Sequence, residues 1–255
     1  MNSKPKKGGL RLAIIGLFVG IIFGIALLSI EKKIGKFFAN MLHEEAQEAC
    51  GCEFSADSLK FSLLTLSGKA TNAKITLNGE DQLVVPKLSA SFNLLSHIRE
   101  KRIAITNLKL EDAKIYQADP SGGTFQFIDH LATPLTEEQK NQNKIRVKMV
   151  ALEVSNGHLI QKIPAGTFVA EDISLQYQRL PNNDLLLTPV SKKISFTRRD
   201  SISAPITIGR LESLLRINKE QISIAKLFLK KGSSTISAVG NLDNNNNIDL
   251  SLIHI

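Results

Sequence analysis

The sequence contains no tryptophan and only two tyrosines among its 255 residues. Proteins that bind single-stranded nucleic acid stack bases on aromatic rings, so this low aromatic content argues against such a site. The formal charge is +8, but residues 1–36 hold seven basic side chains and one acidic one, which gives 7 − 1 = +6. The remaining 219 residues carry 25 basic and 23 acidic side chains, a balance of only +2. The folded part therefore lacks the charge that nucleic-acid binding requires, and no nucleic-acid partner is expected.

Signatures of catalysis and metal binding are also missing. The five histidines are scattered, and none lies at ligand spacing from another histidine or a cysteine. There is no glycine-rich phosphate loop, nucleophile elbow or carboxylate pair in an apolar setting. We therefore expect no enzyme, no metal site and no cofactor.

The two cysteines form the motif Cys50-Gly51-Cys52. One intervening residue is too few for an ordinary tetrahedral metal site and makes a disulfide strained. We favour two unpaired small hydrophobic residues, with pairing left open for an oxidising compartment.

The longest uncharged run covers residues 12–30. As a helix, its 19 residues would be about 28 Å long, close to the apolar thickness of a bilayer. Gly24-Ile25-Ala26 has the form of a signal-peptidase site, but apolar residues continue beyond it, which favours an uncleaved transmembrane anchor. Residues 1–11 then form a basic cytoplasmic N-terminus, and the bulk of the chain is exported.

A glycine repeats every four residues within this predicted anchor, which would let a second membrane helix pack closely against it: Gly16, Gly20 and Gly24. Glycine is common in membrane spans, so ordinary composition is the alternative explanation.

An amphipathic helix is predicted for residues 31–50, directly after the anchor. Its apolar side chains follow helical spacing on one face, and they are Ile34, Phe37, Phe38, Met41 and Leu42. Charged residues, including Glu44 and Glu45, occupy the rest of the helix. We expect this helix to cap the structure that follows; it could instead prolong the anchor or lie among lipid headgroups.

From Phe54 onward the dominant hydrophobic period changes to two, which is typical of strands with one face in water. The clearest run is 87–94, and others are 73–77, 144–149, 173–177, 194–197, 222–224 and 248–252. Asn78-Gly79, Asn156-Gly157 and residues 243–247 indicate turns. The sequence predicts a mainly β, largely antiparallel fold.

A helical or loop insertion at 125–143 divides this region into a first β block, 54–124, and a second, 144–255. No flexible linker separates the blocks, so we expect one elongated sheet. The chain ends in an apolar strand, and complete proteins normally cover such an edge. We favour a sheet that continues beyond the chain end over an edge that pairs with another chain.

The order of these features resembles the N-terminal region of the AsmA-like superfamily, and of its TamB group in particular. The resemblance is carried by the anchor, the amphipathic helix and the run from Cys52 to Phe61, followed by a leucine-rich strand, Gly68 and the form Asn-Ala-x-Ile at 72–75. Residues 103–115 and 147–159 repeat that pattern. TamB proteins are far longer and end in a domain absent from this chain.

The resemblance implies a curled β-groove that carries phospholipid acyl chains across the periplasm from a single-pass anchor in the bacterial inner membrane. A sheet with one apolar face must cover that face, close on itself or hold apolar ligands. Our candidates for the groove lining are Phe61, Leu88, Ala90, Phe92, Ile145, Val147, Ile173, Leu175, Ile194 and Phe196. The alternative is that these side chains fill a closed β-sandwich.

Three functions follow from this interpretation. The first is a phospholipid conduit between inner and outer membranes. The second is a scaffold for outer-membrane protein assembly, in which an exposed strand edge binds a β-barrel assembly protein. The third, a membrane-bound hydrolase, would need clustered ionisable residues within the sheet, which the sequence does not suggest.

Overall fold

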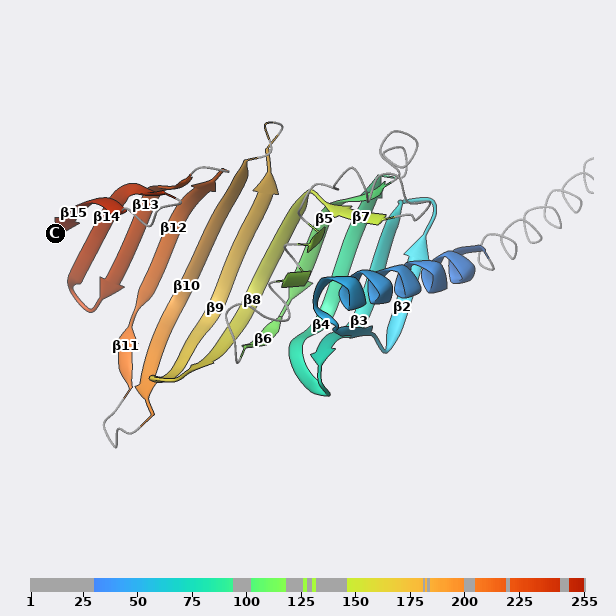
Figure 1. Ribbon diagram of the computed structural model, residues 1–255, viewed down its shortest axis with the longest axis horizontal. Helices are drawn as coiled ribbons and strands as arrows, with labels where there is room; N and C mark the ends of the chain where they lie inside the picture. The colour runs from blue at the N-terminus through green and yellow to red at the C-terminus, as the bar shows by residue number, and fades with distance from the viewer. Residues whose placement is uncertain are drawn as a thin grey trace, which may run out of the picture.

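The computed structural model describes residues 30–93, 102–117, 126–127, 130–131, 146–180, 182, 184–199, 205–218, 221–243 and 248–254. They form one large curled sheet of 15 strands with a single long helix, residues 30–50, against one face (Figure 1). The predicted anchor at 12–30, with Gly16, Gly20 and Gly24, lies outside the described residues except for its last position. No helix within the described ranges is both long and apolar enough to cross a membrane.

The first block contributes six strands to the sheet. They are β1 (Glu53–Ser55), β2 (Ser58–Ser62), β3 (Ser67–Leu77), β4 (Glu80–Asn93), β5 (Arg102–Glu111) and β6 (Lys114–Gln117). The pairs β1–β3, β2–β3, β3–β4, β4–β5 and β4–β6 are all antiparallel.

The second block contributes nine strands. They are β7 (Arg146–Met149), β8 (Ala151–Ile163), β9 (Gly166–Arg179), β10 (Leu185–Arg198), β11 (Ile206–Ile208), β12 (Arg210–Ile217), β13 (Gln221–Lys231), β14 (Ser234–Asp243) and β15 (Ile248–His254). They join the first block through parallel pairs, β5 with β7 and β8, and β6 with β8, and continue antiparallel to β15. The predictions of a mainly β fold and of one largely antiparallel sheet are confirmed.

Cross-strand register keeps the apolar rows of all strands on one face, which we call the inner face because the helix lies on it. Ala90 opposes Leu108, and Leu108 opposes Leu152. The same row continues through Leu187, Leu215, Ile224 and Leu250 to the last strand, across the pairs of the second block. One side of the whole sheet is therefore apolar, as strict alternation predicts.

Ion pairs mark the opposite, outer face. Lys109 lies 2.9 Å from Glu153, Lys193 lies 2.9 Å from Glu171, and Lys226 lies 2.9 Å from Glu212. Each pair is partly exposed and adds little stability, about 0–1 kcal/mol. These charged side chains keep the outer face in contact with water.

The two asparagine–glycine pairs differ in role. Asn78 and Gly79 connect β3 to β4 with φ values of 54° and 80°, as predicted for a hairpin turn. The turn predicted at Asn156-Gly157 is wrong, because both residues lie inside β8, where the pairing with β9 shifts register around Gly157. Asn156 has a φ of 53°, a conformation that a β-bulge uses as readily as a turn does.

The helix over residues 30–50, the cap helix, covers the inner face of the first block (Figure 1). Phe38 stacks on Phe61 of β2 at 5.1 Å between ring centroids and lies 4.6 Å from the ring of Phe92 on β4. The predicted capping role is confirmed. Phe37, placed on the buried face by its spacing, is 46% exposed, so that assignment was wrong.

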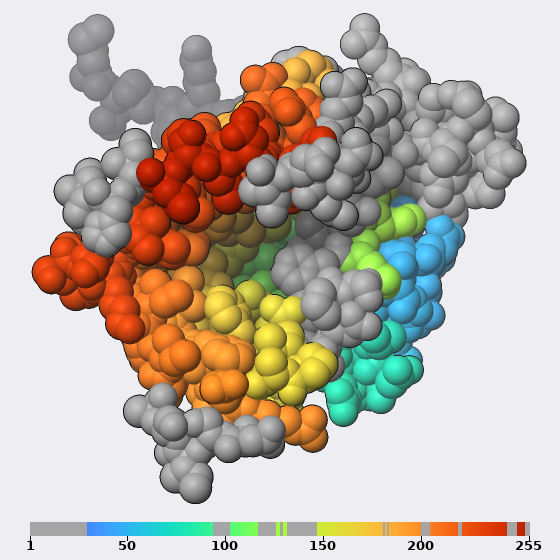
Figure 2. Space-filling view, turned by 60° about the vertical axis from the view of Figure 1, so that its left-hand side comes forward, coloured from blue at the N-terminus to red at the C-terminus, as the bar shows by residue number. Residues whose placement is uncertain are grey.

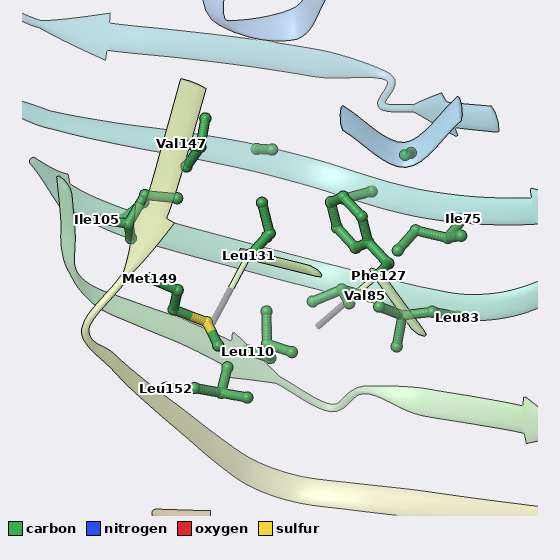
Figure 3. Packing of buried hydrophobic residues seen from close by; sticks show 14 of the residues in the cluster. Ile75, Leu83, Val85, Ile105, Leu110, Phe127, Leu131, Val147, Met149 and Leu152 are labelled. Carbon is green, nitrogen blue, oxygen red and sulfur yellow. The ribbon is translucent and has the colours of Figure 1, made fainter. Parts of the chain in front are cut away.

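A second part of the cover comes from the insertion. Phe127 and Leu131 have helical backbone conformation and are buried. Their side chains point toward those of β4, β5, β7 and β8 (Figure 3). Met149 and Val147 on β7 are also fully buried in this cluster. The rest of the predicted insertion at 125–143 lies outside the described residues.

Cys50 and Cys52 form a disulfide, so the interpretation as two unpaired hydrophobic residues was wrong. The cap helix ends at Cys50, and Gly51, with a φ of 66°, reverses the chain so that the two Cα atoms lie 5.1 Å apart. Glycine tolerates this left-handed conformation at no steric cost. The disulfide therefore fixes the end of the cap helix to the start of the sheet.

Replacing both cysteines with alanine is expected to lower the free energy of unfolding by only about 1–2 kcal/mol, because the closed loop is very short. Urea unfolding of the wild-type chain and of the C50A/C52A variant measures this difference. Alkylation of both thiols in the native chain without a reductant would contradict the pairing itself.

Candidate functional site

The inner face of the sheet differs between its two halves. In the first, the cap helix, Phe127 and Leu131 lie over β2 to β8, and the buried cluster extends as far as Tyr177, with Leu185 and Leu187 packed against it. In the described part of the chain, that cluster has no member on β12 to β15. The first half is a two-layered interior, whereas the described residues place no second layer over β12 to β15.

Six of the predicted lining residues belong to the buried cluster of the covered half or pack against it: Phe61, Leu88, Ala90, Phe92, Val147 and Leu175. The first four line a cavity of about 60 Å³ together with side chains of the cap helix. A neighbouring cavity measures about 40 Å³. For comparison, a dry cavity of about 150 Å³ binds benzene. Phe61, Leu88, Ala90 and Phe92 thus face a small apolar cavity beneath the cap helix, and Val147 is buried in the same cluster.

Three other predicted lining residues lie outside that cluster. Ile173 faces inward from β9, and Ile194 and Phe196 face inward from β10. Ile145 lies outside the described residues.

The apolar inner face of the second half forms a trough. We define the trough by the inward side chains Ile194, Phe196, Leu211, Leu215, Ile224, Leu227, Leu229, Ile236, Ala238, Leu242, Leu250 and Leu252. Figure 2 shows the hollow that strands β9 to β15 (yellow to red) surround. Ile236 and Leu250 are more than two-fifths exposed, and Leu252 is 70% exposed. Large apolar side chains thus face the hollow without full protein cover.

The residues on β12 to β15 were not among the predicted lining. Residues 222–224 and 248–252 alternate as regularly as the chosen segments do, so extending the alternation rule to them would have found β13 and β15. Residues 211–217 carry a weaker signal, because Ser213 and Leu214 break the alternation.

Polar side chains on the inner face of β10 and β12 are few, and Ser191 is bonded to the backbone. Ser191 on β10 donates its hydroxyl to the backbone oxygen of Glu171 at 2.9 Å. It also lies 3.1 Å from the oxygen of Lys193. Among the described residues of β10 to β15, the charged side chains that point inward stand only at strand ends. The trough can therefore hold apolar chains by contact, whereas a polar solute would find little to bind.

The size of the trough suits an alkyl chain. Five strands at a spacing of about 4.8 Å give about 19 Å across, and ten residues give about 33 Å along a strand. One leaflet of a bilayer has about 15 Å of hydrocarbon depth, half of the full core. A phospholipid tail therefore fits on this face in either direction.

The electrostatics of the outer face are local. Glu212 accepts a hydrogen bond from Lys226, which lowers the pKa of its carboxyl group, and the charge of Arg210 acts in the same direction. The lowered pKa of Glu212 favours its ionised form, which suits a side chain of the outer face.

One buried carboxylate, Glu45, was missed. Its side chain is 1% exposed, although helical spacing had placed it with the charged residues. One carboxylate oxygen accepts a hydrogen bond from the backbone N–H of Val147 at 3.2 Å, and the other lies 2.7 Å from Nε2 of His130. Glu45 thus joins the cap helix to β7 and to the insertion.

Glu45, Glu48 and His130 offer ligand atoms within 4.8 Å of one another, a spacing that could suit a metal ion. The carboxylate of Glu45 is already engaged on both oxygens by protein groups. We therefore assign this cluster a structural role in holding the cover over the first half.

Comparison of the chain with protein-family models, curated proteins and solved structures found no match. The function is therefore argued from the trough itself.

Proposed function

We propose that this chain carries phospholipid acyl chains in the trough, as a non-enzymatic, membrane-anchored protein of the AsmA-like type and the TamB group. The observation that supports this most is the continuous apolar row that runs from β10 to β15 with side chains up to 70% exposed. Exposed apolar patches of this extent in soluble domains mark binding surfaces.

Two further features agree with the proposal. The uncharged run at 12–30 would tether the chain to a membrane, which places the trough near its lipid source. The Cys50–Cys52 disulfide suits an oxidising compartment such as the periplasm. On this view the covered first half is a rigid base between the membrane and the trough.

The proposal is tested by photo-crosslinking in bacterial cells with the full chain. A photoreactive residue at Leu215 faces the trough, whereas the same residue at Leu214, one position away, faces outward beside Lys226. We expect phospholipid adducts, detected by mass spectrometry, at Leu215 and few or none at Leu214. Equal labelling at both positions, or no lipid at Leu215, would reject lipid carriage.

A second function, assembly of outer-membrane proteins by strand addition, is favoured by β15. Within the described residues this strand pairs with β14 alone, and it contains only one charged residue, Asp249. Unguarded edges of this kind accept additional strands. In that case a photoreactive residue on β15 would capture a polypeptide, such as a β-barrel assembly protein, in place of lipid.

A further inference from the structure

The two long edges of the trough differ in charge. At the edge where β10 and β13 end, drawn as the lower edge of the sheet in Figure 1, the chain is basic. At this edge we count the two terminal residues of each strand from β8 to β15 and the described residues that connect these strands. This set contains six basic side chains. They are Lys162, Arg198, Arg199, Arg210, Lys230 and Lys231, and no described residue of this set is acidic. We call this edge the basic rim.

All six side chains of the basic rim are exposed. Arg210 pairs with Glu212 on the outer face. No ion pair joins the other five to an acidic side chain in the part of the chain that the structure describes. Cations of this kind are available to an external anion.

The opposite edge, counted in the same way, carries Arg179 and Arg216 against Asp184, Asp243 and Asp249. Arg216 is already bound to Asp184 at 2.7 Å. The opposite edge therefore has no net positive charge. The positive charge of the trough is concentrated at the basic rim.

Two cations of the basic rim lie at the ends of apolar rows of the trough. Arg198 follows Phe196 by two residues on β10, and Lys231 follows Leu229 by two residues on β13. Alternation therefore puts both on the inner face, at the end of an apolar row. At the opposite edge the corresponding rows of β10, β12, β13 and β14 end in Leu185, Ile217, Ile222 and Leu242.

We infer that the basic rim selects anionic glycerophospholipids, with phosphate groups bound at Arg198 and Lys231 and acyl chains lying across the trough toward the opposite edge. This inference rests on the proposed function and adds the headgroup class and the orientation. Guanidinium and ammonium groups bind phosphate oxygens through charge-assisted hydrogen bonds. A zwitterionic headgroup carries its own cation, which the rim repels.

The test uses the full chain in vesicles of equal parts phosphatidylglycerol and phosphatidylcholine, with the photoreactive residue at Leu215. The ratio of the two lipids among the adducts is measured by mass spectrometry. Attraction of an anionic lipid changes affinity about fivefold per cation, so two cations predict enrichment of phosphatidylglycerol by about 25-fold at low salt. Raising the salt concentration should lower this ratio.

Reversing both charges, in R198E/K231E, should bring the ratio to one or below, and the neutral R198Q/K231Q should fall between this and wild type. The matched control K87E/K192E makes the same charge change on exposed lysines of the outer face and should keep the wild-type ratio. A wild-type ratio of one, or an unchanged ratio in R198E/K231E, overturns selection by the rim while lipid carriage stands. Absence of any lipid adduct overturns the proposed function and this inference together.

Discussion

Replacing Glu45 with alanine is expected to lower the free energy of unfolding by about 3–5 kcal/mol, because two hydrogen bonds to a buried carboxyl group are lost at about 1.5–3 kcal/mol each. The carboxylate accepts from the backbone N–H of Val147 and pairs with His130, and its side chain is 1% exposed. Removing it leaves a buried N–H without this acceptor and a void under the cap helix. Urea unfolding followed by circular dichroism measures the loss.

The matched control is Glu44→Ala, one residue earlier on the same helix and exposed. Its effect should stay below about 1 kcal/mol, as for surface charges in general. Equal losses in the two variants would contradict the assignment of Glu45 as the residue that joins the cap helix to β7 and the insertion.

Replacing Leu215 with aspartate is expected to reduce phospholipid capture at a photoreactive residue placed at Leu229 by at least about tenfold. A tenfold loss corresponds to about 1.4 kcal/mol of binding free energy. Transferring a carboxylate from water to an apolar contact costs several kcal/mol, so a loss of at least this size is expected. Leu215 lies in the middle of the trough, opposite Leu187 on β10 and Ile224 on β13. An acyl chain that runs along β12 from the basic rim toward the opposite edge passes this side chain.

Leu214→Asp is the control for this experiment, because the side chain faces outward and opposes Lys226. It should leave lipid capture unchanged, and circular dichroism should confirm that both variants keep the sheet. Equal loss of capture in the two variants would mean that the effect comes from weakened strands, and it would remove the support for the trough as the binding surface.

The sequence predicts the sheet and its apolar face well because both depend on local alternation. Residues 87–93 and 194–197 lie in β4 and β10 with the expected sides inward. Helical spacing likewise identifies the cap helix from Ile34, Phe38 and Met41. The absence of a linker between the two blocks correctly indicates a single sheet.

What covers the apolar face is not encoded in the same local pattern. Val147 and Leu250 both alternate with polar neighbours, yet the first is buried in the cluster that contains Leu131 and the second is 41% exposed in the trough. Glu45 is buried because its partners lie 85 and 102 residues away in sequence. Helical spacing around Glu45 contains no information about those contacts. The same limit applies to Asn156-Gly157, since a positive φ is compatible with a turn and with a bulge.

The most direct test of lipid binding in the trough is an experimental electron-density map of the full chain, purified from bacterial membranes. We expect elongated density of non-protein origin along Leu215, Leu227 and Leu229, and protein side chains alone beneath the cap helix. A map in which a second layer of this chain's own side chains fills the trough would contradict it. The protein would then be a closed β module without a surface for lipid.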